Sequence, residues 1–283
     1  MVQTVYRFMR FPGGKTKALA TSYDDGVGTD LRLMDIFRKN GIKGTFNINA
    51  CFTPEEDADV EKHPTSRLSL SQIKTFYKDM EIATHGAGHP FYHDLPVSAV
   101  TTDLIRDREI LEKTFGKIIR GHAIPNSQFD SDTLMAMKAA GIIYARTGGN
   151  SESFTIPESF LPYYPTSHHN NPNLSTLIDR FLGDGTYICS PKFFCLWGHS
   201  FEFEQHGNWQ HMEEVCRKLG NREDVFYGGM EEIFTYTAAF RSLVYSMDGK
   251  TVYNPTSYTL WMDLDVYHKK TVSILPGQTL TLD

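Results

Sequence analysis

The chain contains 283 residues, of which 40% are hydrophobic and 22% are charged, and its formal net charge at pH 7 is -6. This composition is that of an ordinary globular protein, and the length allows one large domain or two small ones. A negative net charge without a basic cluster argues against a nucleic-acid partner and against an anionic membrane surface.

Export and membrane signals are also missing from the pattern. No segment reaches the apolar length that spans a bilayer, and the N-terminus lacks the continuous apolar region of a signal peptide. The four cysteines, Cys51, Cys189, Cys195 and Cys216, have neither C-x-x-C spacing nor the density of a disulfide scaffold. We therefore expect free thiols and a cytoplasmic protein, unless processing has removed a signal peptide.

Strand-like and helix-like segments alternate along most of the chain. The strand-like segments include 17–23 (KALATSY), 44–52, 81–85 and 142–148. The helix-like segments include 29–41, 70–80, 97–116 and 130–141, and a polar loop is expected over 53–67. Gly41, Gly116 and Gly141 are suited to end three of these helices, and Asp130 or Ser131 to begin the last one.

This alternation continues through 175–182, 191–199 and 208–220. Repeated βα units predict a parallel sheet or barrel that is covered by helices. Beyond the segment that ends at residue 245, the pattern changes to short strand-like runs, KTVYN, YTLWMDL and TVSILPG. We expect one domain over 1–245 and, packed on it, a β-rich C-terminal extension over 246–283 with an antiparallel pattern.

Polar motifs fall at the ends of the predicted strands. Asp24 and Asp25 close the first strand, His85 closes the third, Pro125 follows another, and His199 ends a late one. In α/β architectures the C-terminal strand ends and the loops after them carry the chemistry. We therefore expect these side chains to lie on one rim of the sheet.

The adjacent carboxylates of Asp24 and Asp25 allow two interpretations. Asp-Gly is common turn chemistry, so Asp25-Gly26 could simply end a strand. Alternatively, one carboxylate ligates a divalent cation while the other takes a proton from water that the cation acidifies. The cation would also relieve the repulsion between the two charges.

Two histidines strengthen the second interpretation. His85 and His89 are four residues apart, but Gly86, Gly88 and Pro90 disfavour a regular helix, so we expect a tight loop with converging rings. Two imidazoles and one carboxylate provide the three protein ligands of a catalytic divalent site with an open position.

These motifs resemble those of a known family. TSYDDG resembles the first motif of the polysaccharide deacetylases (carbohydrate esterase family 4, the NodB-homology domain), which is usually T-F-D-D-G. HGAGH resembles their second motif, H-S/T-x-x-H, and LWGHS at 196–200 resembles the late motif in which histidine follows leucine. The motifs occur in the family order, and the resemblance covers roughly residues 15 to 245.

The resemblance implies a fold, a cofactor and a reaction. The fold is a deformed (β/α) barrel with about seven parallel strands, and the cofactor is one divalent metal ion, Zn²⁺ or alternatively Co²⁺ or Ni²⁺. It implies Asp25, His85 and His89 as metal ligands, Asp24 as general base and His199 as general acid. The reaction implied is hydrolysis of an acyl group, typically N-acetyl on an amino sugar or O-acetyl on a sugar.

The third family motif is altered in this chain. Arg-x-Pro-Tyr is expected, but residues 123–126 read Ala-Ile-Pro-Asn, so the arginine that would pair with the base is missing there. We hypothesise that Arg146, at the end of a neighbouring strand, supplies this charge to Asp24. The backbone N–H of Asn126, beside Pro125, would then be the oxyanion donor, a role that needs no particular side chain.

The fourth motif, an Asp-Trp pair, has no clear counterpart. Asp179 and Asp184 are available, but neither has a tryptophan nearby, so no orienting partner of His199 is identified.

Other residues near the motifs have open roles. Trp197 and Phe201 flank His199 and could line a pocket for an acetyl methyl or a sugar face, or could equally belong to the core. His168 and His169 lie in a polar loop and could be solvated or could contact substrate.

The sequence therefore predicts a metal-dependent hydrolase that acts on a carbohydrate or a small acylated substrate. Two alternatives remain: hydrolysis of a C–N bond in a small non-sugar amide, and a catalytically silent carbohydrate-binding module. A silent module should have lost a ligand or the acid, yet all five motif residues are present. The oligomeric state is not predicted.

Overall fold

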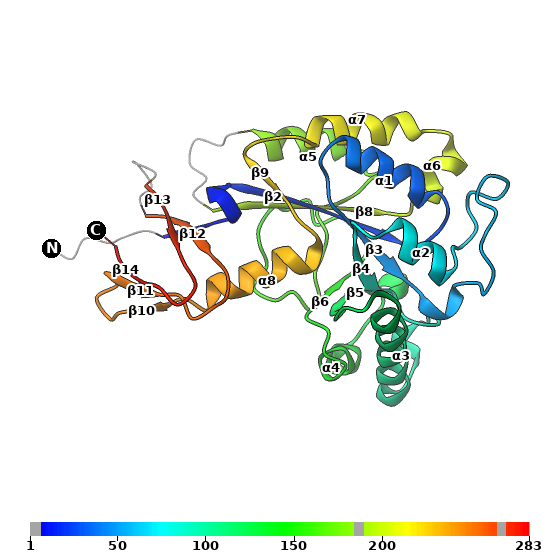
Figure 1. Cartoon of the computed structure of the whole chain (residues 1–283), viewed down its shortest axis with the longest axis horizontal. Coiled ribbons are helices and arrows are strands. Elements are labelled where there is room, and N and C mark those ends of the chain that lie inside the picture. The colour runs from blue at the N-terminus through cyan, green and yellow to red at the C-terminus, as the bar shows by residue number, and fades with distance from the viewer. Residues whose placement is uncertain (1–6, 184–189, 265–269, 283) are drawn as a thin grey trace.

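The computed structural model describes residues 7–183, 190–264 and 270–282 (Figure 1). Cys51, Cys195 and Cys216 are free thiols in it, whereas Cys189 and Asp184 lie outside the described residues. In these ranges no helix has both the length and the apolar character needed to cross a bilayer.

The centre of the molecule is a curled sheet of parallel strands in the order β6-β5-β4-β3-β2-β8-β7. A short strand, β9 (Val225–Tyr227), pairs with the beginning of β2. The predicted deformed barrel with seven parallel strands is therefore confirmed. Its strands are β2 (Lys17–Asp24), β3 (Gly44–Ile48), β4 (Glu81–Thr84), β5 (Gly121–Ala123), β6 (Tyr144–Arg146), β7 (Ser167–His168) and β8 (Lys192–Gly198).

Strand β2 is the central element of this sheet. All eight of its residues are buried, because β8 lies along one side and β3 and β9 share the other. Its apolar residues face helices on both sides, as is usual for a parallel strand that is covered on two faces. The register places Asp24 beside Asn47 of β3 and Tyr23 beside Gly198 of β8.

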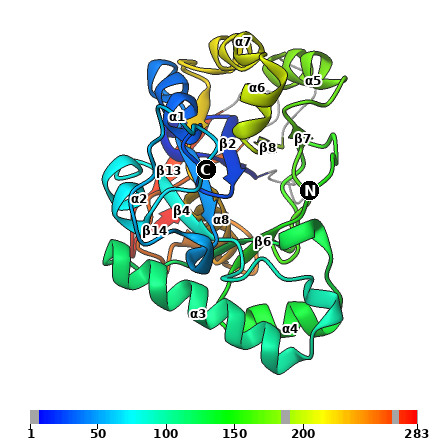
Figure 2. The ribbon, with the colours of Figure 1, turned by 90° about the vertical axis from the view of Figure 1, so that its right-hand side faces the viewer.

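Eight helices are assigned in the described residues: α1 (Asp30–Lys39), α2 (Leu70–Phe76), α3 (Val97–Phe115), α4 (Ser131–Ala139), α5 (Leu174–Leu182), α6 (Phe201–His206), α7 (Trp209–Leu219) and α8 (Met230–Arg241). Figure 2 shows α5, α6 and α7 on one side of the sheet and α3 and α4 on the other. Local sequence explains their ends: Asp130 accepts the amide of Thr133 at 2.8 Å at the start of α4, and Gly116 ends α3 with a φ of 67°.

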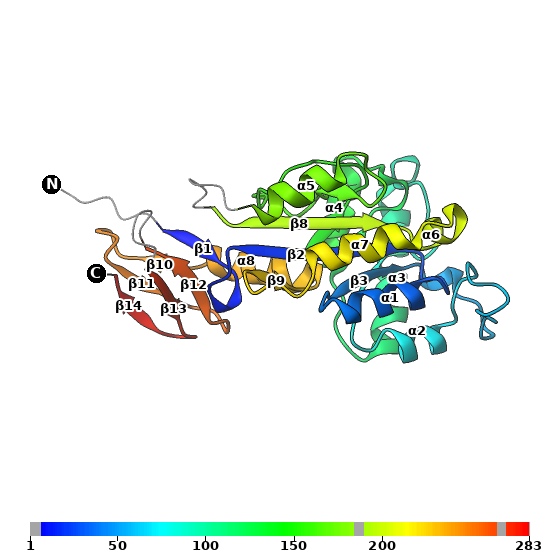
Figure 3. The ribbon, with the colours of Figure 1, turned by 90° about the horizontal axis from the view of Figure 1, so that it is seen from above.

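The C-terminal residues form two small antiparallel sheets, β1-β12-β13 and β10-β11-β14. A strand before the barrel, β1, joins the first of them, which the sequence pattern does not predict. In Figure 3 these strands lie at the end of the molecule from which β8 points away. Their bounds are β1 (Phe8–Arg10), β10 (Val244–Tyr245), β11 (Thr251–Tyr253), β12 (Leu260–Asp263), β13 (Thr271–Ile274) and β14 (Thr279–Thr281).

The small sheets share a hydrophobic core with the barrel. Leu260 and Ile274 are fully buried in a cluster that also contains Phe193 of β8 and Phe234 of α8. The side chain of Arg10 contributes a buried ion pair, with Nε 2.6 Å from Asp263 Oδ2. The C-terminal strands therefore pack directly against the barrel.

Two leucines of the extension test this packing. Leu260→Ala removes a fully buried side chain and should lower the free energy of unfolding by about 2–5 kcal/mol. Leu275 is 54% exposed, so Leu275→Ala should change it by less than about 0.5 kcal/mol. Denaturant unfolding checks both, and a main transition unchanged in Leu260→Ala would mean that the extension unfolds separately.

Candidate functional site

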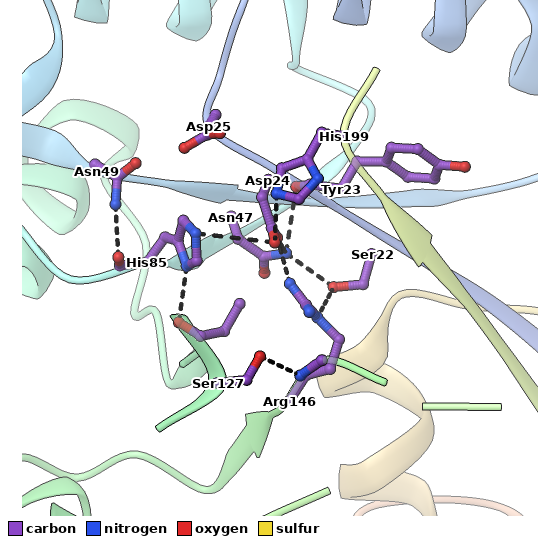
Figure 4. A network of polar contacts seen from close by, with 12 residues as sticks. Ser22, Tyr23, Asp24, Asp25, Asn47, Asn49, His85, Ser127, Arg146 and His199 are labelled. Atoms are coloured by element: carbon purple, nitrogen blue, oxygen red, sulfur yellow. Dashed lines mark hydrogen bonds and ion pairs between the residues drawn. The ribbon is translucent and has the colours of Figure 1, made fainter. Parts of the chain in front are cut away.

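Side chains from several strand ends converge at the C-terminal rim of the sheet (Figure 4). Asp24 ends β2, His85 follows β4, Arg146 ends β6 and His199 follows β8. Parallel strands place all their C-terminal ends on one edge, so residues up to 175 positions apart in the chain meet there (199 minus 24).

The carboxylate of Asp24 is the buried centre of this group. Its Oδ1 accepts hydrogen bonds from Asn47 Nδ2 at 2.7 Å and from Arg146 Nη2. Its Oδ2 lies 3.8 Å from His85 Nε2 and 3.7 Å from His199 Nε2. One oxygen is thus held in place while the other faces two imidazoles.

Arg146 is fully buried beside Asp24, at the position where a neighbouring strand ends. Its Nε donates to Ser22 Oγ at 3.0 Å, and its guanidinium lies 4.8 Å from the centre of the Trp197 ring. An arginine at the end of β6 therefore supplies a positive charge beside Asp24, and residues 123–126 contain none.

The ionisation of Asp24 depends on this arginine. Burial alone would raise the pKa of the carboxyl, but the opposing charge of Arg146, followed by His85 and His199, lowers the pKa well below its usual range. Asp24 is consequently a carboxylate at any physiological pH, although it is almost inaccessible to water.

Asp25, His85 and His89 form a group whose ligand atoms all lie within 4.8 Å of one another. His85 Nδ1 donates to the carbonyl oxygen of Ala123 at 2.9 Å, which leaves a lone pair on Nε2. The two imidazole rings are 4.8 Å apart and nearly perpendicular. One carboxylate and two neutral imidazoles suit a divalent cation, so this donor set fits the ion that the resemblance implies.

The backbone carries unusual conformations at two of these residues. Asp25 has a φ of 87° and His89 a φ of 48°, in the region that residues other than glycine seldom adopt. The amide of Asp25 donates to Asn47 O at 3.0 Å, which helps to hold the turn. Such conformations persist where the surrounding structure imposes them, and functional sites are a common place for them.

Arg67 contacts Asp25, and the sequence analysis assigned it only to a polar loop. Its Nη2 lies 2.8 Å from Asp25 Oδ1, and its Nη1 donates to Asp25 O at 2.8 Å and to Asn49 Oδ1 at 2.9 Å. The loop is brought there by pairing of Arg67 with Val27. Arg67 orients the carboxylate and leaves its second oxygen free for a cation.

Two aspartates of α3, one helical turn apart, hold the loop that contains His85 and His89. Asp107 accepts the amides of Ala50 at 2.8 Å and His85 at 3.0 Å. Asp103 accepts the amides of Ala87 and Gly88, each at 3.0 Å. Burial raises the pKa of Asp107 to about 8 despite these amide donors. The i, i+4 spacing on an amphipathic helix was the only sequence signal for this pair.

His199 has a carboxylate partner that the sequence analysis did not identify. Its Nδ1 lies 2.7 Å from Oε1 of Glu202, three residues later, whereas Asp179 is exposed on α5. Burial alone would lower the pKa of His199, but the hydrogen bond to Glu202 and the charges of Asp24 and Asp25 raise it. The spacing His-x-x-Glu at the start of α6 could have suggested the pair.

Glu202 is itself surrounded by donors. Asn170 Nδ2 donates to its Oε2 at 2.7 Å, and Nε2 of His168 and of His169 lie 3.4 and 3.3 Å from its two oxygens. Burial would raise the pKa of Glu202, but the contacts with His168, His169 and His199 lower it well below its usual range. Glu202 is therefore a fixed negative charge next to His199.

His168, His169 and Glu202 also lie close enough together to hold a cation. However, His168 Nδ1 accepts the amide of Asn170 at 3.1 Å, so the neutral ring carries its proton on Nε2, toward Glu202. The geometry therefore favours a hydrogen-bonded support for Glu202. Gly198 leaves space for the His169 ring, because a Cβ at residue 198 would lie 2.1 Å from His169 Nδ1.

The remaining predicted residues line the same rim. Pro125 is buried after β5, and Asn126 is exposed with a φ of 55°. Trp197 Nε1 donates to Gly149 O at 2.8 Å, and the edge of the His168 ring meets the Trp197 ring at 4.6 Å between centres. Trp197 is thus held by its neighbours and remains partly exposed.

Comparisons with known proteins identify a family model and solved structures that this chain resembles. Residues 11–145 match the family model described as "Polysaccharide deacetylase". A protein from Mycobacterium smegmatis described as a polysaccharide deacetylase has a similar structure, with a TM-score of 0.58 and 17% identity, covering 84% of this chain and 96% of that one. None of the curated proteins matches the chain.

Two further solved structures are similar at 14% identity. The CE4 domain of a multidomain xylanase from the hindgut metagenome of Trinervitermes trinervoides has a TM-score of 0.51, over 80% of this chain and 92% of that one. A mutant, with restored activity, of a CE4 family pseudoenzyme from Bacillus anthracis has the same score, over 80% and 70%. These structures support the fold alone, and the family model supports a hydrolase of this type. The resemblance to polysaccharide deacetylases is thereby confirmed.

The Glu202–His199 contact gives a prediction about proton affinity. Glu202→Gln removes the negative charge at Nδ1, so the pKa of His199 should fall relative to that of the unmodified protein. An NMR pH titration of the histidine ring protons measures this. Glu204→Gln, on the exposed side of the same helix, should leave the pKa of His199 unchanged. Equal effects of the two variants would argue against a direct interaction.

Proposed function

We propose that this chain, whose residues 11–145 match the polysaccharide deacetylase family, is a metal-dependent hydrolase that removes an acetyl group from a carbohydrate or amino sugar. The observation that carries the proposal is the buried Asp24 carboxylate, which faces His85 and His199 beside the Asp25, His85 and His89 group.

Asp25, His85 and His89 are the proposed ligands of one divalent ion, and Zn²⁺, Co²⁺ or Ni²⁺ would suit their nitrogen and oxygen donors. When bound, the ion would polarise the acyl carbonyl and lower the pKa of the attacking water. Arg67 and the carbonyl of Ala123 would support this step by fixing the orientation of Asp25 and of the His85 ring.

Asp24 is the proposed general base. It is ionised because Arg146 offsets its burial, and its Oδ2 is the oxygen not bound by Arg146 and Asn47. That oxygen can accept the proton that water loses as the new bond to the acyl carbon forms.

His199 is the proposed general acid. Glu202 accepts its Nδ1 proton, and the raised pKa favours a second proton on Nε2, which faces the reaction site. When the C–N or C–O bond breaks, this proton passes to the leaving amine or alkoxide. Asp24 can then return the proton taken from water to His199 Nε2, 3.7 Å away. The amide of Asn126 is the proposed donor to the developing oxyanion.

A silent binding module would not need a base, an acid and a set of metal donors in contact. Because this chain retains all of them, the enzyme is the better supported function.

Two variants should distinguish the loss of bound metal from the loss of turnover. His85→Ala should lower the amount of metal that copurifies, whereas Asp24→Asn should retain metal and lose a factor of about 10² to 10⁴ in kcat. Metal analysis and acetate release from a panel of acetylated sugars measure the two quantities. His93→Ala, an exposed histidine in the same loop, should change neither. Full activity in a metal-stripped sample would falsify the mechanism.

Arg146 should control the acidic side of the pH–rate profile. In Arg146→Met, burial raises the pKa of Asp24 without an opposing guanidinium, so activity should be lost at a higher pH as the medium is acidified. Leaving a buried charge unpaired should also cost about 3–5 kcal/mol of stability. Arg146→Lys should show an intermediate shift. A kcat/KM profile identical to that of the original protein in both variants would contradict the pairing.

A further inference from the structure

Another buried acidic side chain outside the motifs, that of Asp30, joins the segments that carry Asp25 and His199. Asp30 is the first residue of α1 and is fully buried. Its Oδ1 accepts the hydroxyl of Ser200, and its Oδ2 accepts the hydroxyl of Tyr77 at 2.6 Å and the amide of Val27 at 3.1 Å.

Ser200 is the residue immediately after His199. Its Oγ also contacts Thr29 Oγ1 at 2.6 Å, and both residues are buried. Since the Ser200 proton is donated to Asp30, Thr29 donates to Ser200. A continuous chain of hydrogen bonds therefore runs from Thr29 through Ser200 to Asp30.

The position of this chain follows from the sheet. Strands β2 and β8 are neighbours, with Tyr23 beside Gly198, so the loops that follow them leave the sheet side by side. One loop carries Asp25 and leads into α1, and the other carries His199 and leads into α6. Asp30 and Ser200 form a side-chain hydrogen bond between the two loops.

We propose that Asp30 is a positioning residue for His199 and acts through Ser200. The proposal rests on the role of His199 as the acid. A base and an acid must keep their relative geometry within fractions of an ångström, and a misplacement of 1 Å can cost about 100-fold in rate. Fixing Ser200 to α1 fixes the backbone that carries the imidazole opposite Asp24.

If Asp30 only stabilised the local fold, fewer hydrogen bonds to its carboxyl group would be enough. A carboxyl group at the start of α1 needs only the Val27 amide to fix the turn before the helix, and an apolar side chain would avoid the cost of burying a polar group. Instead, the two carboxyl oxygens of Asp30 accept hydrogen bonds from three different segments of the chain, at Val27, Tyr77 and Ser200. Fully bonded polar networks of this kind hold one arrangement in preference to others.

Tyr77 and Ser200 give a matched pair of variants. Ser200→Ala and Tyr77→Phe each delete one hydroxyl that donates to Asp30, but only Ser200 adjoins His199. Ser200→Ala should lower kcat about tenfold or more with KM and metal content unchanged, and Tyr77→Phe should keep kcat within about threefold. Asp30→Ala should behave like Ser200→Ala, and the isosteric Asp30→Asn should recover part of kcat.

A second measurement separates this inference from the proposed function. NMR resonances of the His199 ring should move in Ser200→Ala and Asp30→Ala, and should not move in Tyr77→Phe, whether or not an acetylated substrate is turned over. Equal losses in kcat for Ser200→Ala and Tyr77→Phe, or unchanged His199 resonances in Ser200→Ala, would overturn the positioning role. Thermal unfolding of each variant identifies any that fail to fold, and Asp30→Asn then replaces Asp30→Ala.

Discussion

The arrangement of this site depends on keeping one carboxylate charged inside the sheet. Asp24 is buried at the end of the central strand, and an ionised group without partners would be very unfavourable there. Arg146 offsets that cost, Asn47 fixes one oxygen, and His85 and His199 face the other. Because Asp24 and these four partners come from five parallel strands or the loops after them, the curled sheet is what allows them to meet.

Each loop that carries a proposed catalytic or ligand side chain is in turn held by an acidic side chain to which no chemical step is assigned. Glu202 binds the ring of His199, Asp30 binds the backbone segment next to it through Ser200, and Asp103 and Asp107 accept amides of the His85–His89 loop. Main-chain amides and hydroxyls are donors, so the accepting oxygens of acidic side chains are well suited to fixing irregular loops. The helices thereby determine how precisely the loops are placed.

The sequence was informative wherever local pattern and strand-end position were enough. Alternating segments predicted the parallel barrel, and the motifs at strand ends predicted that Asp24, His85 and His199 would meet, because parallel strands end on one edge. Glu202 and Arg67 were missed, since a charged residue in a polar segment usually faces solvent, and only tertiary packing brings these two inward. Pairing of β1 with β12 was equally unpredictable, because it joins segments about 250 residues apart, such as Arg10 and Trp261.

The protonation of Asp24 is the most direct measure of the central claim. A ¹³C NMR titration of its carboxyl carbon in the intact protein would report that state without any assumption about substrate. The account predicts that Asp24 stays ionised below the usual aspartate pKa of about 3.9, despite its burial. Protonation of Asp24 near neutral pH would contradict it, because the carboxylate could then neither pair with Arg146 as an anion nor accept a proton from water.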